Sequence, residues 1–257
     1  MNSKKRKKIS PQLYQDRTYR QNIDAQGMVS SYVSVKETDL HILAAREIER
    51  QALDLVYQFR NQLENYIAAR PEFLTALVPI DKDLLAPPIV KQMLEAASSA
   101  DVGPMAAVAG AIAEFVGFGL LDQGIDEIII ENGGDIFIKR NKECITSIFT
   151  GQSPLNQKLG IKIAKADMPI GVCTSSGTVG HSLSLGQADS VTVLAASTPL
   201  ADAAATRIGN EVSSKAAGSA IEHALDIGRN ISGLSGVVII QGEKIGAWGE
   251  INLVGLD

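Results

Sequence analysis

The sequence predicts an α+β fold, built mostly from antiparallel sheets with packed helices. Short runs rich in Val, Ile and Thr are separated by tight turns, which is typical of antiparallel strands. Helical patterns come in blocks instead of alternating with single strands. The stretch "IIIENGGDIFI" places an Asn-Gly pair between two apolar runs, which is the strongest short hairpin signal.

The composition is that of a soluble globular protein. The 257 residues are 45% hydrophobic and 21% charged, and the net charge of −5 argues against a dedicated nucleic-acid surface. Five cations between Lys4 and Lys8 predict a disordered, solvated tail over residues 1–17, with contact to RNA, acidic lipid or a partner as alternatives. No domain boundary is evident afterwards, so residues 18–257 are predicted to form a single domain.

Neither a secretory signal nor a membrane span is expected. No apolar segment follows the basic tail, and no run of about 18 apolar residues is evident elsewhere. The two cysteines, Cys144 and Cys173, are too few for a disulfide framework. These features predict a cytoplasmic protein without membrane or nucleic-acid partners.

The first part of the domain is predicted to begin with strands and continue with helices. The clearest helix spans residues 48–67, because apolar residues recur there at helical spacing and Pro71 ends the pattern. Strands are expected over residues 18–24, 28–35 and 37–43, and further helices over residues 90–97 and 103–117.

The helix predicted over residues 103–117 has an unusually bare face. Ala107, Gly110 and Ala111 carry little or no side chain there. Such a face lets another backbone or a flat ligand approach closely, and tight packing on a sheet explains it equally well.

The second part is predicted to be mainly strands, with two helices. The helix at residues 198–212 has Thr198 as its expected N-cap and Pro199 in its first turn. A second helix is expected over residues 215–225. Strands are expected over residues 125–140 (as a hairpin), 144–149, 159–165, 169–175, 188–197, 236–241 and 244–249.

The hairpin turn contains Asn132, Gly133, Gly134 and Asp135. An Asn-Gly turn needs no function, since it is a common connection between strands. Two glycines would also let backbone N–H groups approach a ligand, with the carboxylate of Asp135 beside them. Both interpretations stay open on the turn alone.

Asp202 and Thr206 are four residues apart and share one face of the predicted helix. A carboxylate and a hydroxyl are hard oxygen donors suited to Mg²⁺ or Ca²⁺. The alternative is an aspartate favoured by the helix dipole and a threonine bonded to its own backbone.

The stretch "GVCTSSGTVGHS" has three interpretations. Cys173 could be a nucleophile with His181 as its base. Thr174, Ser175, Ser176 and Gly177 could instead form a phosphate-binding loop of hydroxyls and exposed amides. The third interpretation is a polar turn in which Cys173 is a small buried side chain. The histidines and cysteines show no zinc-ligand spacing.

The order of these segments resembles a known family. The helix "GPMAAVAGAIAE", the hairpin "IIIENGGDIFI", the loop "GVCTSSGTVGHS", the strand "ADSVTVLAAS" and the helix "LADAAATRIG" resemble the ApbE superfamily. Its type member is the magnesium-dependent FAD:protein FMN transferase. Over almost its whole length, the chain looks more like the small, uncharacterised, cytoplasmic ApbE-like family.

The resemblance to the transferases implies a T-fold-like architecture with two related halves. It also implies FAD bound against the hairpin and the Thr174 loop, and Mg²⁺ held by Asp202 and Thr206. In such a transferase the pyrophosphate of FAD is cleaved as FMN passes to a Ser or Thr hydroxyl of a target protein. The metal acts there as a Lewis acid and charge clamp.

The chain departs from the transferase pattern at three places. Ala109 stands at the position of a lysine, and Glu114 at that of an aspartate. The segment after His181 is shortened to "HSLSLG" and lacks the Asp-Pro and Thr-Gly of the transferases. The scaffold and the metal pair therefore look kept, whereas the FAD-specific and catalytic elements look altered.

Three function classes follow. The favoured one is a protein that binds a flavin, another nucleotide or a phosphorylated small molecule with Mg²⁺, and that is related to the transferases with altered specificity. The second is sulfur handling in anaerobic sulfur assimilation and homocysteine formation, which the uncharacterised family implies. It would require a thiolate at Cys173. The third is a non-catalytic interaction module on the same scaffold, for which a homodimer is a plausible assembly.

Overall fold

A computed structural model of the chain describes residues 27–151, 153–176, 186–213 and 217–256. Its main sheet has eight strands in the order β1-β2-β3-β4-β7-β8-β9-β10, and all neighbouring pairs are antiparallel. These strands are β1 (Val29–Val35), β2 (Thr38–Ala44), β3 (Ile128–Asn132), β4 (Asp135–Lys139), β7 (Ile170–Ser175), β8 (Ser190–Ala195), β9 (Leu234–Gln241) and β10 (Lys244–Gly249).

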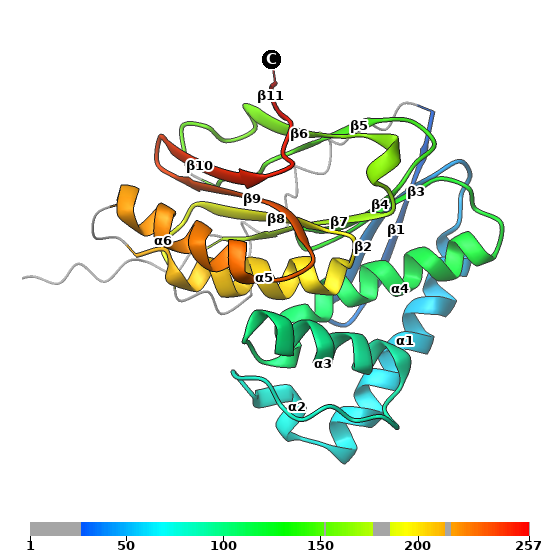
Figure 1. Ribbon diagram of the computed structural model, residues 1–257. Helices are drawn as coiled ribbons and strands as arrows, with labels where there is room; N and C mark the ends of the chain where they lie inside the picture. The colour runs from blue at the N-terminus through cyan, green and yellow to red at the C-terminus, as the bar shows by residue number, and fades with distance from the viewer. Residues whose placement is uncertain (1–26, 152, 177–185, 214–216, 257) are drawn as a thin grey trace, which may run out of the picture.

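Helices cover one face of the main sheet, and a small second sheet covers the other (Figure 1). The helices are α1 (Glu49–Ala69), α2 (Glu72–Thr75), α3 (Pro88–Ala100), α4 (Val108–Asp122), α5 (Thr198–Glu211) and α6 (Ala217–Asn230), with short 3₁₀ turns η3 (Pro104–Ala107) and η4 (Lys165–Asp167). The second sheet contains β5 (Cys144–Ser147), β6 (Leu159–Ile163) and β11 (Leu253–Gly255), in the order β11-β6-β5.

Each central strand contributes to two hydrophobic cores, because successive side chains point to opposite faces of a sheet. On β3, Ile130 packs toward the helices, whereas Ile129 packs toward the small sheet. On β7, Cys173 faces the helices and Val172 faces the small sheet. Burial on both faces explains why these strands are apolar throughout.

The predicted α+β class with mostly antiparallel sheets is confirmed. The predicted strands and helices within the described residues are present, with bounds shifted by a few residues. Three short elements were not predicted: α2, which has four residues, and η4 and β11, which have three each. The strand expected over residues 18–24 and the tail over residues 1–17 lie outside the described residues.

The segment Pro104–Asp122 is the one described helical segment long and apolar enough to cross a membrane by length and composition, with a mean hydropathy of 1.7. The glycines and Glu114 interrupt the apolar residues of this segment, so the sequence analysis did not identify it as an apolar run. In the fold, 56% of an 18-residue window within it is buried. α4 packs there against α1, α5 and the strands β3 and β4, so its place in the core accounts for its hydropathy.

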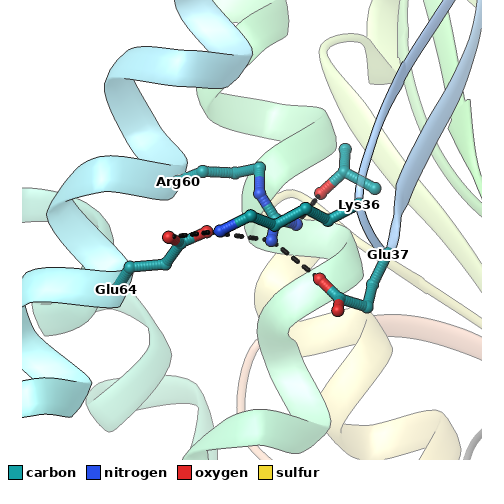
Figure 2. A network of polar contacts seen from close by, with 5 residues as sticks. Lys36, Glu37, Arg60 and Glu64 are labelled. Atoms are coloured by element: carbon teal, nitrogen blue, oxygen red, sulfur yellow. Dashed lines mark hydrogen bonds and ion pairs between the residues drawn. The ribbon is translucent and has the colours of Figure 1, made fainter.

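Arg60 of α1 holds the β1–β2 turn against the helices (Figure 2). Its guanidinium donates to Thr38 Oγ1 at 2.7 Å, to Glu37 Oε2 at 2.7 Å and to Glu64 Oε1 at 3.0 Å. Lys36 Nζ also donates to Glu64, at 2.7 Å. Hydrogen bonding to Arg60 is the main cause that lowers the pKa of Glu37.

Replacing Arg60 with methionine, which keeps the aliphatic stem, is expected to lower the free energy of unfolding at neutral pH. The contribution through Glu37 is present above the unfolded pKa of a glutamate, about 4.3, and is lost as pH falls through the lowered folded pKa. The difference between the two proteins should therefore shrink in acid. Urea unfolding at about pH 7 and about pH 3 measures it, and an equal difference at both would contradict this account.

Candidate functional site

The β3–β4 hairpin ends in a two-residue turn whose glycines have positive φ, +69° at Gly133 and +111° at Gly134. The Gly134 N–H donates to Glu131 Oε1 at 2.9 Å, so this amide is already bonded. Gly133 is exposed, with open space beside its α carbon. A hydrogen bond inside the hairpin therefore stabilises the turn, and Gly133 is exposed to solvent.

The side chain of Asn132 connects the hairpin to α4. Its Nδ2 donates to the carbonyl oxygen of Ala109 at 3.0 Å. Ala109 lies in the first turn of α4 and is only half-buried. The predicted ligand-binding hairpin and the predicted bare helix therefore meet at the start of α4.

Helices α4 and α5 cap each other's starts. Neither N-cap residue, Ala107 or Ser197, makes a side-chain capping bond. Instead, Asp202 Oδ2 accepts from the Gly110 N–H at 2.9 Å, and Glu114 Oε2 accepts from the Thr198 N–H at 2.6 Å. Carboxylates are favourable partners for the unpaired N–H groups at a helix start.

This arrangement corrects the expected cap of α5. Thr198 was predicted as the N-cap, but it is the first residue of the helix and Ser197 precedes it as N-cap. The partner of the Thr198 amide is Glu114, which lies 84 residues earlier in the chain. A tertiary contact thus replaces the local capping bond that the sequence suggested.

The bare face of α4 receives a backbone. A Cβ added to Gly110 would lie 2.6 Å from the carbonyl oxygen of Thr198 and 2.9 Å from Cβ of Asp202. Of the two explanations for this face, close approach of another backbone is the one present at Gly110. That backbone belongs to α5.

Asp135, Cys173 and Asp202 gather between the sheet and the two helix starts. Asp135 and Cys173 are register partners on β4 and β7, and both are buried. Burial raises the pKa of Asp135 well above its usual range, and the nearby charge of Asp202 raises it further. Burial also raises the pKa of Asp202, against the lowering effect of the Gly110 and Ala109 amides.

Cys173 lies in an environment that opposes thiolate formation. Its Sγ contacts the carbonyl oxygen of Thr198 at 3.4 Å, and the side chain is fully buried. Burial and the charges of Asp135 and Asp202 raise the pKa of the thiol well above its usual range. The sulfur hypothesis requires the opposite shift, since the thiolate is the reactive form.

We expect Cys173 to resist alkylation in the folded protein. Iodoacetamide at about pH 8 should leave Cys173 unmodified, because the thiol is buried and protonated, and should label it after unfolding in urea. Peptide mass spectrometry distinguishes Cys173 from Cys144, which is also buried. Rapid labelling of Cys173 in the native protein would contradict this account and favour the sulfur hypothesis.

The residues after Cys173 divide between the two faces of the sheet. Thr174 Oγ1 lies 3.0 Å from Thr192 Oγ1, and this pair lies on the face opposite the helices. Ser175 is buried at the end of β7, on the same face as Cys173, and Ser176 follows it half-buried. The side chain of Thr174 therefore points away from the Asp135–Cys173–Asp202 cluster.

Two of the predicted site residues, Gly177 and His181, lie outside the described residues. Their proposed roles in a ligand loop and as a base stay predictions.

Asp202 and Thr206 lie one turn apart on α5 and are both half-buried, whereas Ala203, Ala204 and Ala205 between them are buried. Their shared position on the helix is thus less buried than that of the three alanines between them. Among the described residues, no three His, Cys, Asp or Glu side chains form a group that could hold a metal ion. A metal at Asp202 would need ligands of other kinds as well.

Two residues of the site were not assigned a role from the sequence. Glu114 was noted only as a departure from a pattern, although one buried acid in an otherwise apolar helix is itself a signal. Glu131 is buried in the middle of an apolar strand and bonds the hairpin turn. In both cases the partner is visible only in the fold.

A family model described as "AbpE bacteria" matches residues 20–244. Two relatives illustrate its sequence similarity. A UPF0280 protein of Methanococcus aeolicus is 41% identical, with 87% of this chain and 91% of the relative covered. A UPF0280 protein of Methanococcus maripaludis is 43% identical, with 85% and 90% covered.

Solved structures share the fold at much lower sequence identity. The apo form of the flavinyl transferase ApbE of Pseudomonas stutzeri superposes with a TM-score of 0.56 at 13% identity, covering 86% of this chain and 93% of that one. A mutant of the flavin transferase ApbE from Vibrio cholerae gives a TM-score of 0.55 at 11% identity, covering 86% and 96%. The predicted architecture is therefore confirmed at the level of the fold.

Proposed function

The chain belongs to the family described as AbpE bacteria, and we propose that it binds FAD or a related nucleotide together with Mg²⁺, as a flavin-transferase-related protein of altered specificity. The proposed site lies where the hairpin turn meets the first turns of α4 and α5. The observation that carries the proposal is the position of Asp202, which the Gly110 amide holds at this junction.

The donor chemistry of the site fits Mg²⁺. Asp202 and Thr206 offer a carboxylate and a hydroxyl from half-buried positions one turn apart on one helix. Hard oxygen donors of this kind suit Mg²⁺, which commonly takes one or two protein ligands and fills its shell with water and substrate phosphates. The described residues contain no group of three His, Cys, Asp or Glu side chains that could hold a metal, so waters and nucleotide phosphates would have to supply the remaining ligands.

Binding of a diphosphate at this site should depend strictly on the metal. Ala109 supplies no cation at the start of α4, and the acidic groups that meet there are Asp202, beside the Ala109 and Gly110 amides, and the neighbouring Asp135. Carboxyl groups supply no positive charge to a diphosphate, so a divalent cation would have to bridge it to the protein. This is the electrostatic reason to expect no binding without Mg²⁺.

When bound, Mg²⁺ would supply charge stabilisation at the pyrophosphate. The chain's own residues would bind and orient the nucleotide. Asp202 is oriented by the Gly110 amide, and Asn132 fixes the hairpin turn relative to α4. The exposed Gly133 would let the backbone approach the ligand closely.

Titration of the protein into FAD, followed by flavin fluorescence, tests this proposal. Saturable binding is expected in Mg²⁺ and should be lost in excess EDTA. Equal binding in both conditions would overturn the role of the metal, and no saturable binding in either would overturn the proposal itself. Incubation with FAD, Mg²⁺ and a Ser/Thr-containing target protein would then test flavin transfer by mass spectrometry.

A further inference from the structure

We infer that Glu114 is a positioning residue of this site, because its carboxylate fixes the start of α5 and thereby the place of Asp202. The inference rests on the proposed function for the identity of the ligand. The contact between Glu114 and the start of α5 does not depend on any ligand. Glu114 is buried on α4, and its Oε2 accepts from the Thr198 N–H at 2.6 Å.

The start of α5 is closely packed by its neighbours. Thr198 is fully buried between two glycines that approach its backbone. A Cβ on Gly171 of β7 would lie 2.5 Å from Thr198 Cα, and one on Gly110 of α4 would lie 2.6 Å from its carbonyl oxygen. The Thr198 N–H therefore depends on Glu114, since an unpaired buried amide is costly.

The two carboxylate contacts have matching spacing along both helices. Gly110 and Glu114 are one turn apart on α4, and Thr198 and Asp202 are one turn apart on α5. Movement of the α5 start would therefore displace Asp202 from the Gly110 amide as well. Glu114 bonds the first residue of α5, so its effect on Asp202 is exerted through that helix.

The contact has a feature that packing alone does not explain. A carboxyl group is placed inside an otherwise apolar helix, where burial raises its pKa and the Thr198 amide opposes the rise. An apolar residue of the same size would fill this space without that cost. The oxygen acceptor is thus the property that distinguishes Glu114 from a core residue.

Two variants of similar size distinguish the effect of the hydrogen-bond acceptor at position 114 from the effect of side-chain packing. Glu114→Gln keeps an oxygen acceptor, whereas Glu114→Leu removes it. Ile112→Val, on the same helix and in the core, is the control for general destabilisation. Each protein is examined by Mg²⁺-dependent FAD titration and by amide hydrogen exchange at Thr198 and the next residues of α5, with circular dichroism to confirm folding.

We expect Glu114→Leu to weaken Mg²⁺-dependent FAD binding by about tenfold or more and to speed amide exchange at the start of α5. Glu114→Gln and Ile112→Val should resemble the wild type in both readouts. Unchanged exchange and binding in Glu114→Leu, or an equal loss in Ile112→Val, would overturn the inference. If the wild type binds no FAD, the proposed function fails, and the exchange data alone decide the role of Glu114.

Discussion

Replacing Gly110 with alanine is expected to lower the free energy of unfolding by about 2–4 kcal/mol. The new Cβ would lie 2.6 Å from the carbonyl oxygen of Thr198, which is backbone and cannot rotate away. Separation of α4 from α5 would also stretch the bond between the Gly110 amide and Asp202. At an unconstrained helical site the same change would stabilise the protein by about 0.5–1 kcal/mol. A loss of stability would therefore indicate that α5 approaches α4 closely at Gly110.

Gly119→Ala is a matched control on the same helix. Its added Cβ would meet Leu55 Cδ2 at 2.8 Å, the far end of a flexible side chain that can change its rotamer. We expect it to be nearly neutral in urea unfolding. If Gly110→Ala were as stable as Gly119→Ala, the close crossing of α4 and α5 would be contradicted.

Two substitutions of Asp202 are expected to have different consequences. Asp202→Asn keeps an oxygen that can accept from the Gly110 amide but removes the negative charge, so the fold should be kept. Asp202→Ala removes both, and loss of the helix cap should cost about 1 kcal/mol of stability. Both should weaken Mg²⁺-dependent FAD binding by about a hundredfold or more, because the charged metal ligand is lost.

Urea unfolding without metal and FAD titration with Mg²⁺ measure the two roles separately. The decisive protein is Asp202→Asn, which should be folded and unable to use Mg²⁺. Wild-type binding by this variant would show that Asp202 only caps α4. A loss of stability in Asp202→Asn as large as in Asp202→Ala would mean that the amide oxygen does not replace the carboxylate as a cap.

The strand and helix positions could largely be predicted from the sequence, because periodic apolar residues and turn glycines are local signals. The hairpin at Asn132 to Asp135 and the long helix α1 are clear examples. α2 was missed because four residues show no periodicity. β11 was missed because its strand pairing with β6 is set by residues about 90 positions away in the chain.

The residues of the candidate site could be predicted from the sequence, but the contacts among them could not. The sequence placed Asp202 on a helix and suggested a metal, yet its bond to Gly110 joins residues 92 positions apart. The bond between the Thr198 amide and Glu114 also joins distant residues. For this reason the N-cap predicted at Thr198 was wrong and no role was predicted for Glu114. The direction of the Thr174 side chain was not predicted either. Thr174 belongs to the predicted loop, but side chains alternate between the two faces of the sheet along β7, and that of Thr174 points toward Thr192.

A crystal structure of the protein grown with FAD and Mg²⁺ would locate the metal and the nucleotide together. We expect Mg²⁺ in contact with the carboxylate of Asp202 and the hydroxyl of Thr206, and the FAD diphosphate between this metal and the turn at Gly133. FAD bound elsewhere on the chain, or a metal held by residues other than Asp202 and Thr206, would contradict it.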